Sequence, residues 1–187
     1  MAGYAATVQI RTSDPPMEGH GYFYRLDWLD HVMSIPPPRV VVIEDLDQDP
    51  GRGSFIGEIH ANILLALECA GVVTSGGVRD VPAVRALNFQ MFARNVSVSH
   101  AYSHIFDFGK PVEVGQLEVR PGDLLFGDRH GVLTIPLEIA SKIPGVARKT
   151  AEEEQEIIKL CRSGDFTMKK LRDAVTTLGI KRKEVKS

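Results

Sequence analysis

A short run of four branched apolar residues, Val40-Val41-Val42-Ile43, constrains the fold of this chain more than any other segment. Such a continuous run is typical of a strand that is buried on both faces of a sheet. Three prolines over 36–38 precede the run and end a helix predicted over 22–33, and an acidic loop over 44–57 follows it. The run therefore predicts a central strand in a sheet that is covered on both sides.

The segments around this strand alternate between strand and helix. A strand is predicted over 5–10, a helix over 58–70 with Gly71 as its C-terminal cap, a second short strand over 72–74 and a helix over 81–87. Alternation with short links favours an α/β architecture with a right-handed crossover connection.

The second half of the chain is richer in predicted β-structure. Strands are predicted over 91–98 and 112–119, and a hairpin over 124–135 turns through Asp128-Arg129-His130-Gly131. A charged helix over 147–161 ends at Gly164, and a last helix runs to residue 178 with Asp165 or Thr167 as its cap. A length of 187 residues fits one domain. We therefore expect an α/β domain over 1–164, followed by a C-terminal helix and basic tail over 165–187.

Composition excludes several function classes. The net charge is −2, so no overall attraction to nucleic acid or anionic lipid is expected. The longest apolar run, Ile63–Leu67, is far shorter than the roughly 20 residues of a membrane-spanning helix. Cys69 and Cys161 lie far apart and form no paired metal-ligand spacing, which fits a reduced cytoplasmic compartment. A small anionic ligand needs a local positive site in such a protein.

The loop over 44–57 contains Gly51, Gly53 and Gly57, which superficially suggest a phosphate cradle. Their spacing misses the dinucleotide fingerprint, and no Lys-Ser/Thr pair of a P-loop follows. The loop also contains three aspartates that would repel a polyphosphate, Asp45, Asp47 and Asp49. A flexible loop at the carboxyl end of a strand is the better interpretation, and ligands of open α/β sheets bind near such ends.

A second candidate site is Ser75-Gly76-Gly77-Val78-Arg79-Asp80, in which two glycines follow a strand and adjacent opposite charges precede a helix. The glycines let a ligand approach the backbone closely, Arg79 can grip a carboxylate with two N–H groups, and Asp80 can hold a hard divalent cation. The alternative is a surface turn in which Asp80 caps the next helix.

Several short motifs occur in a fixed order. They are Gly57-Glu58, Arg79-Asp80 after twenty further residues, Phe92-Ala93-Arg94, Pro121-Gly122-Asp123, and the stretch from Asp128 through Gly131-Val132 to Ile135-Pro136. Over residues 3–164 the chain resembles the RraA-like family. That family contains regulators of ribonuclease activity, 4-hydroxy-4-methyl-2-oxoglutarate aldolases and oxaloacetate decarboxylases, and some members carry an older, erroneous name as demethylmenaquinone methyltransferases.

The resemblance implies an α/β fold of the swivelling phosphohistidine-domain kind, with β/β/α layers and C-terminal helices. It also implies a homotrimer or a hexamer whose active sites lie between subunits. By position, Arg79 binds the 2-oxo acid, Asp80 holds Mg²⁺ or Mn²⁺, and Glu58 orients a metal-bound water.

The remaining site residues also follow from the resemblance. The backbone N–H groups of Gly57, Glu58, Ile59 and His60 begin a helix and take the substrate carboxylate. An acidic residue from a neighbour's C-terminal helix completes the site, and Glu154 is our choice. The alternatives are Glu152 and Glu153, or a solvated helix face with no role in the site.

These residue types suit a metal-dependent lyase, a class II aldolase or decarboxylase, that acts on a small 2-oxo dicarboxylate. Retro-aldol cleavage of a 4-hydroxy-2-oxo acid and decarboxylation of oxaloacetate both pass through pyruvate enolate, for which a chelated cation is an electron sink. The alternative is a non-catalytic protein that binds and regulates a ribonuclease E-type enzyme. The combination of Glu58, Arg79 and Asp80 favours the lyase, because a pure binding module has no physical need for these charges.

Two features depart from the family's pattern. Relatives usually have a helical segment ahead of the strand that matches residues 3–8, and this sequence shows none. Ser75-Gly76 stands where many relatives have Asp-Gly, which changes the hydrogen bonding around the Arg-Asp motif.

Four further features leave alternatives open. His100 and His104 have a spacing that suits zinc on a helix, but their context favours structural or substrate-shaping histidines. His130 is predicted to lie in a turn. The pocket is expected to be shaped by residues 22–28, His60 and residues 100–104. The basic tail, which contains Lys181, Arg182, Lys183 and Lys186, could contact RNA or protein, although such a tail is usually solvated.

Overall fold

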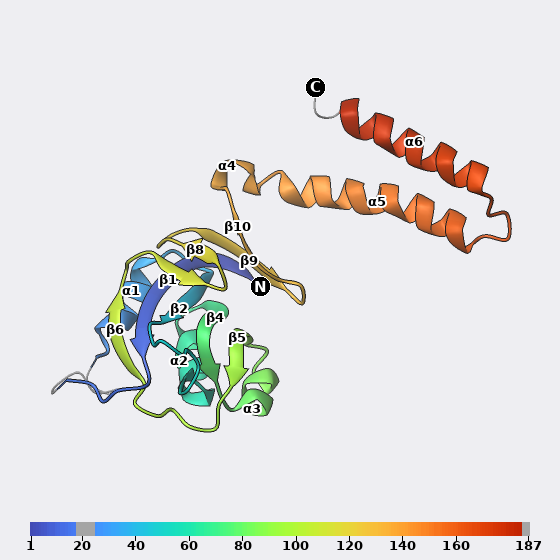
Figure 1. Ribbon diagram of the computed structural model, residues 1–187. Helices are drawn as coiled ribbons and strands as arrows, with labels where there is room; N and C mark the ends of the chain where they lie inside the picture. Colours follow the sequence, from blue (N-terminus) through green and yellow to red (C-terminus); the bar gives the residue numbers. More distant parts are fainter. Residues whose placement is uncertain (18–24, 185–187) are drawn as a thin grey trace. The chain divides into compact units, whose positions relative to one another are not determined.

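The structure of the protein is a computed structural model that describes residues 1–17 and 25–184. The chain divides into two compact units, Met1–Pro136 and Leu137–Ser187. The first unit contains a mixed sheet, a small hairpin and three helices (Figure 1). The second unit contains three helices. Among the described residues, no helix is long and apolar enough to cross a membrane.

The main sheet of the first unit has eight strands. They are β1 (Ala2–Arg11), β2 (Arg39–Asp45), β3 (Ser54–Ile56), β4 (Cys69–Val78), β5 (Gln90–Val96), β6 (His104–Phe108), β9 (Leu124–Asp128) and β10 (Gly131–Ile135). The order β10-β9-β1-β2-β4-β3 forms its main path, β5 also pairs with β4, and β6 also pairs with β1. Strands β1 to β5 pair in parallel, whereas β6 and β9 run antiparallel to β1.

The sheet is covered on both faces, as the apolar run over 40–43 predicted. On one face, Val41 and Ile43 of β2 pack in a core with helices α1 (Asp27–Ser34), α2 (Glu58–Ala66) and α3 (Val81–Ala86). On the other face, Val40 and Val42 pack under the hairpin of β7 (Val112–Val114) and β8 (Leu117–Val119). Successive residues of a strand point to opposite faces. Since both faces of β2 are covered, all four side chains are fully buried. The predicted α/β class with β/β/α layers is therefore confirmed.

Several local predictions are wrong. The strand predicted over 112–119 is the hairpin of β7 and β8, and the loop predicted over 44–57 contains β3. Helix α2 ends at Ala66, and Glu68 with its φ of 55° makes the turn that was expected at Gly71. Gly71 instead lies within β4, where a Cβ atom would come within 2.4 Å of the Gln90 carbonyl oxygen. Strand β6 over residues 104–108 was missed, because its pairing with β1 joins segments nearly a hundred residues apart.

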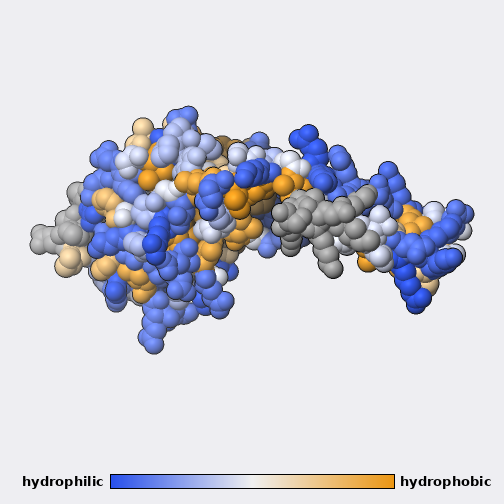
Figure 2. All heavy atoms as spheres, turned by 90° about the horizontal axis from the view of Figure 1, so that it is seen from above, coloured by the Kyte–Doolittle hydropathy of each residue, from blue (hydrophilic) through white to orange (hydrophobic). Residues whose placement is uncertain are grey.

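The second unit consists of α4 (Leu137–Ala140), α5 (Ile143–Arg162) and α6 (Met168–Glu184). Helices α5 and α6 pack against each other through Ile157 on one side and Ala174 and Leu178 on the other. The Thr167 hydroxyl accepts a hydrogen bond from the Lys170 N–H, which confirms Thr167 as a cap of α6. No side chain of α5 is fully buried. Polar residues cover most of the visible surface of these helices (Figure 2).

The boundary between the two units falls at residues 136 and 137, ahead of the domain boundary expected at residue 164. The difference arises because α5 packs with α6 within one unit. The last helix was expected to end at residue 178, but the backbone of α6 is helical through Glu184. Lys186 lies outside the described residues.

Candidate active site

The Arg79-Asp80 pair lies directly after β4, and Gly57-Glu58 lies directly after β3. Strands β3 and β4 pair in parallel, with Ser54 opposite Gly77. The carboxyl ends of the two strands therefore lie side by side, which is where open α/β sheets bind their ligands. The sequence places the two motifs apart, and the sheet brings them together.

Asp80 adopts the left-handed conformation, with φ 57° and ψ 32°, at the N-cap position of α3. Its carboxylate does not cap α3. Instead, Oδ2 accepts a hydrogen bond of 3.0 Å from the backbone N–H of Glu58, at the start of α2. Aspartate tolerates this backbone conformation better than most side chains. The structure therefore rules out the surface turn in which Asp80 caps its own helix.

The Arg79 guanidinium is held at two of its three nitrogens, Nη1 and Nε. Its Nη1 donates to the Ser54 carbonyl oxygen at 2.6 Å and to the Ser54 hydroxyl at 3.3 Å, and its Nε lies 3.6 Å from Asp80 Oδ2. The side chain is 19% exposed. Among the described residues, Nη2 makes no hydrogen bond of its own, which leaves this nitrogen available to an anion.

Gly57 allows the close approach of these groups. A Cβ atom at this position would come within 2.6 Å of Asp80 Oδ2 and within 2.9 Å of Arg79 Nε. The backbone of Gly57 is extended, with φ −145°, so the requirement for glycine comes from space and not from backbone conformation. Any larger residue would displace the charged pair.

The other residues predicted for substrate binding differ in exposure. The Glu58 side chain is exposed beside Asp80, and the Ile59 side chain is 69% exposed. The His60 side chain is buried and stacks on Phe55, with 4.6 Å between ring centroids. Burial, together with the positive charge of Arg79, lowers the pKa of His60 to about 4. A neutral His60 therefore supports the site from within the core.

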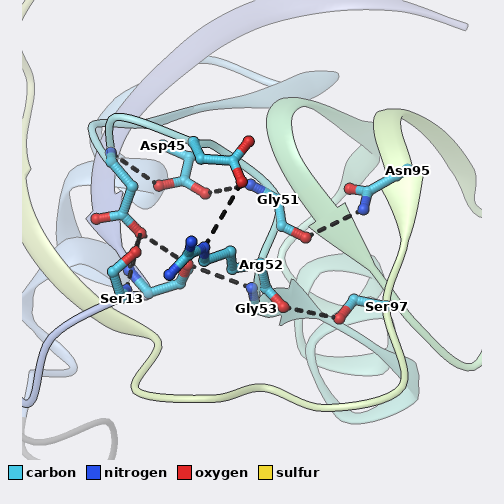
Figure 3. A network of polar contacts seen from close by, with 10 residues as sticks. Ser13, Asp45, Gly51, Arg52, Gly53, Asn95 and Ser97 are labelled. Carbon is cyan, nitrogen blue, oxygen red and sulfur yellow. Dashed lines mark hydrogen bonds and ion pairs between the residues drawn. The ribbon is translucent and has the colours of Figure 1, made fainter.

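The acidic loop is held by its own aspartates, which contrasts with the flexible loop expected from the sequence (Figure 3). Asp45 Oδ2 accepts a hydrogen bond from the Gly51 N–H at 2.8 Å. Burial raises the pKa of Asp45 despite this hydrogen bond. On the opposite side of the loop, Asn95 donates to the Gly51 carbonyl and Ser97 to the Arg52 carbonyl. The buried carboxylates face inward and do not line a phosphate cradle.

Asp47 is bound more tightly still. Its Oδ2 accepts four hydrogen bonds, from the backbone N–H and hydroxyl groups of Thr12 and Ser13, at 2.8 to 2.9 Å. Burial alone would raise the pKa of Asp47, but these hydrogen bonds together lower it below its usual range. The sequence analysis missed this role, because Thr12 and Asp47 are 35 residues apart.

Ser75 also has a structural role. Its hydroxyl oxygen accepts a hydrogen bond of 2.9 Å from the Asp45 N–H. The residue that departs from the family's pattern thus holds the carboxyl end of β2 beside β4. It does not contact Arg79 or Asp80 in any hydrogen bond among the described residues.

His100 and His104, whose spacing suits a zinc site on a helix, each lie within hydrogen-bond distance of a nearby backbone carbonyl oxygen. His100 Nδ1 lies 2.8 Å from the Ala101 carbonyl oxygen, and His104 Nδ1 lies 2.7 Å from the Tyr102 carbonyl oxygen. Neither lies on a helix, which removes the geometry assumed for a zinc site. His130 lies in the turn between β9 and β10, as predicted.

Other residues expected to shape the pocket have different positions. Trp28 is 2% exposed and packs edge-on against Phe55 in the core, so it does not line an open site. Residues 22–24 lie outside the described residues. A cavity of about 390 Å³ lies on the hairpin side of the sheet, lined by Phe92, Arg94 and Leu117 among others. Ser75 of the second candidate motif also lines this cavity, whereas Glu58, Arg79 and Asp80 do not.

Glu154 and its alternatives, Glu152 and Glu153, lie on α5 in the second unit. The described residues contain no group of three or more acidic, histidine or cysteine side chains that could hold a metal ion. The carboxylates of Asp80 and Glu58 are the oxygen donors at the carboxyl ends of β3 and β4. This donor set fits Mg²⁺, which is usually bound by one or two carboxylates and keeps several waters.

The fold and the site define a mixed α/β protein with charged residues grouped at the carboxyl ends of two parallel strands. Residues 1–134 match the model of the RraA-like family, described as Aldolase/RraA. The chain belongs to this family, as its ordered motifs predicted.

Named relatives agree with this assignment. The chain is 30% identical over 156 residues to a putative 4-hydroxy-4-methyl-2-oxoglutarate aldolase of Halalkalibacterium halodurans, covering 83% of this chain and 69% of that protein. Two solved structures share the fold at 23% identity. An uncharacterized protein of Pseudomonas syringae has a TM-score of 0.70 over 95% of this chain and 76% of its own. RraAS2 of Streptomyces coelicolor, an unusual member of the RNase ES inhibitor RraA family, has a TM-score of 0.63 over 83% and 74%.

Proposed function

We propose that the protein is a divalent-metal-dependent carbon–carbon lyase that acts on a small 2-oxo dicarboxylate. The observation that carries this proposal is the meeting of Arg79, Asp80 and the start of α2 at one edge of the sheet. This arrangement offers the Arg79 cation and helix N–H groups to a small anion, and carboxylate oxygens to a divalent metal ion. The family's aldolase relative supports the same class of reaction.

The reaction cleaves one carbon–carbon bond of the substrate. In oxaloacetate, the bond between C3 and the C4 carboxylate breaks, carbon dioxide leaves, and the electron pair forms the enolate of pyruvate. In a 4-hydroxy-2-oxo acid, the 4-hydroxyl loses its proton, the bond between C3 and C4 breaks, and the same enolate forms. The enolate then takes a proton at C3 to give pyruvate.

Different residues of the site interact with different parts of the substrate and its enolate. Arg79 Nη2 faces the developing negative charge while Nη1 stays bound to Ser54. The Glu58 N–H, which was predicted to bind the substrate carboxylate, already donates to Asp80 Oδ2, so Asp80 keeps this helix end beside Arg79. The other N–H groups at the start of α2 bind the substrate carboxylate. Asp80 would hold Mg²⁺ or Mn²⁺, which would supply Lewis-acid stabilisation of the enolate, and the exposed Glu58 carboxylate would orient a water beside it.

The proposed assembly is a homotrimer or hexamer in which Glu154 of one subunit completes the site of the next. Two observations support an intersubunit site. Glu58, Arg79 and Asp80 line none of five cavities found among the described residues, and Glu58 and Asp80 are exposed. A neighbouring subunit would exclude water from this surface.

The test is pyruvate release from oxaloacetate with Mg²⁺ or with EDTA, after subtraction of the rate with Mg²⁺ and no protein. We expect turnover with Mg²⁺, its loss in EDTA and its loss in Asp80→Ala. Asp49→Ala, which removes an exposed carboxylate from the nearby loop, is the matched control and should keep full activity. An unchanged rate in Asp80→Ala would disprove the assigned role. Absence of turnover on every 2-oxo acid tested would favour a protein-binding regulator.

A further inference from the structure

Three hydrogen bonds and the backbone from Gly53 to Ser54 link the buried Asp47 to the Arg79 guanidinium. Asp47 Oδ2 accepts from the Thr12 hydroxyl at 2.8 Å, and the same hydroxyl oxygen accepts from the Gly53 N–H at 3.2 Å. The next residue is Ser54, whose carbonyl oxygen accepts from Arg79 Nη1 at 2.6 Å. Three contacts therefore connect a loop carboxylate to the cation of the candidate site.

Each connecting group is shielded from water. Thr12 and Ser54 are fully buried, and Asp47 is 9% exposed. The Thr12 hydroxyl has one hydrogen to donate and oxygen lone pairs to accept with, so its bond to Asp47 orients it to receive the Gly53 N–H. Hydrogen bonds of buried groups are costly to leave unmade, which makes this arrangement specific.

The backbone around Gly53 fits closely between its neighbours. A Cβ atom on Gly53 would come within 2.6 Å of the His100 carbonyl oxygen and within 2.9 Å of Thr12 Cβ. The Ser54 N–H donates to the Ser99 carbonyl at 2.9 Å, which fixes the peptide group between the Gly53 N–H and the Ser54 carbonyl. These contacts fix the position of the Ser54 carbonyl oxygen. They thereby also restrict the position of the Arg79 guanidinium that donates to it.

We propose that Asp47, acting through Thr12, is a positioning residue for Arg79 that holds its guanidinium in the orientation needed to bind the substrate anion. This inference deepens the proposed function and rests on it. Ser13 provides the matched control, because its hydroxyl also donates to Asp47 Oδ2 at 2.9 Å but, within the described part of the chain, makes no hydrogen bond to Gly53. Removal of either hydroxyl costs Asp47 one hydrogen bond, but only Thr12 leads to Arg79.

The first experiment records the guanidinium signals of Arg79 by NMR in the full chain with ¹⁵N-labelled arginine, assigned with Arg79→Lys. A guanidinium held at Nη1 and Nε rotates slowly and gives separate Nη signals. We expect separate signals in the unmodified protein, in Thr12→Ser and in Ser13→Ala, and merged signals in Thr12→Val. Separate signals in Thr12→Val would overturn the proposal. This readout requires no catalytic activity, so it stands even if the proposed function fails.

The second experiment measures kcat and KM for oxaloacetate with Mg²⁺ in the same variants. We expect kcat/KM to fall about 10- to 100-fold in Thr12→Val, with recovery in Thr12→Ser and no change in Ser13→Ala. Equal losses in Thr12→Val and Ser13→Ala would indicate a purely structural role of Asp47 and overturn the proposal. If Thr12→Val does not fold, Asp47→Asn replaces it. We then expect merged Nη signals of Arg79 and a lower kcat/KM in Asp47→Asn.

Discussion

Arg79 and Asp80 are adjacent in the chain, yet different partners fix their side chains. Arg79 bonds to Ser54 of β3, whereas Asp80 bonds to the first N–H of α2. The chemistry of these two residues and their resemblance to a family motif were sufficient to predict them as site residues. Their partners could not be predicted, because Ser54 lies 25 residues from Arg79 and depends on the pairing of β3 with β4.

Gly57→Ala should reduce activity without unfolding the protein. The added methyl group would displace Asp80 Oδ2 and Arg79 Nε, which lie within 3 Å of its expected position. We expect a loss of about 10²-fold in kcat/KM, in line with a 1 Å misplacement of a catalytic group. Gly164→Ala is the control, since a Cβ atom there has no neighbour within 4 Å. Activity within twofold of the unmodified protein in Gly57→Ala would contradict the geometry of the site.

Arg79→Ala should slow pyruvate release from oxaloacetate about 10²- to 10³-fold, because the enolate loses its nearest positive charge. The guanidinium also bonds to the Ser54 carbonyl, so Arg79→Lys is the informative companion. A lysine keeps the charge but offers no planar pair of N–H edges, and we expect only partial activity from it. Full activity in Arg79→Lys would indicate that charge alone suffices.

His60 should make the stability of the protein depend on pH. Its pKa is about 4 in the folded protein, against about 6.5 when unfolded, so the unfolded chain binds the proton more readily. The stability is fully present above pH 6.5 and is lost as the pH falls toward 4. Urea unfolding should show about 2 kcal/mol less stability at pH 5 than at pH 7 from this group. His60→Leu should remove that part of the pH dependence, and His130→Leu should not.

At the scale of elements, the loop between β2 and β3 holds the candidate site in place. Asp47→Asn should lower the free energy of unfolding by about 2 kcal/mol, because an amide accepts the four hydrogen bonds of this carboxylate less well. Asp49→Asn is the matched change on the same loop, and its exposed ion pair with Arg52 should contribute less than about 1 kcal/mol. Equal effects in urea unfolding would show that the loop is not held by Asp47.

Local sequence pattern predicted most elements of the first unit. The apolar run over 40–43 and the hairpin turning at residues 129 and 130 were recognisable because strand burial and turn chemistry leave local signals. Strand β6 gave no such signal, since its residues become a strand by pairing with Val8 and Ile10 of β1. The end of α2 was misplaced because Glu68 adopts the left-handed conformation that glycine usually supplies.

At the scale of the whole molecule, the proposed site between subunits can be tested by mixing inactive proteins. Arg79→Ala and Glu154→Ala each remove one side of the site. In mixed oligomers, some sites combine the native Arg79 of one subunit with the native Glu154 of the next. In an equal mixture each native residue is present at about half of the sites, so about a quarter of the sites should be active. Activity that does not rise on mixing, although both proteins form the expected oligomer by sedimentation, would contradict a shared site.

The position of β1 in the sheet has a consequence for synthesis of the chain. This first strand pairs with β2 early, but its antiparallel partners β6 and β9 begin only at residues 104 and 124. While the ribosome makes the intervening residues, one edge of β1 lacks the two strands with which it pairs in the folded protein. Unpaired strand edges are sites of aggregation. Nascent chains stalled before residue 104 should therefore depend on chaperones more than chains stalled after residue 135.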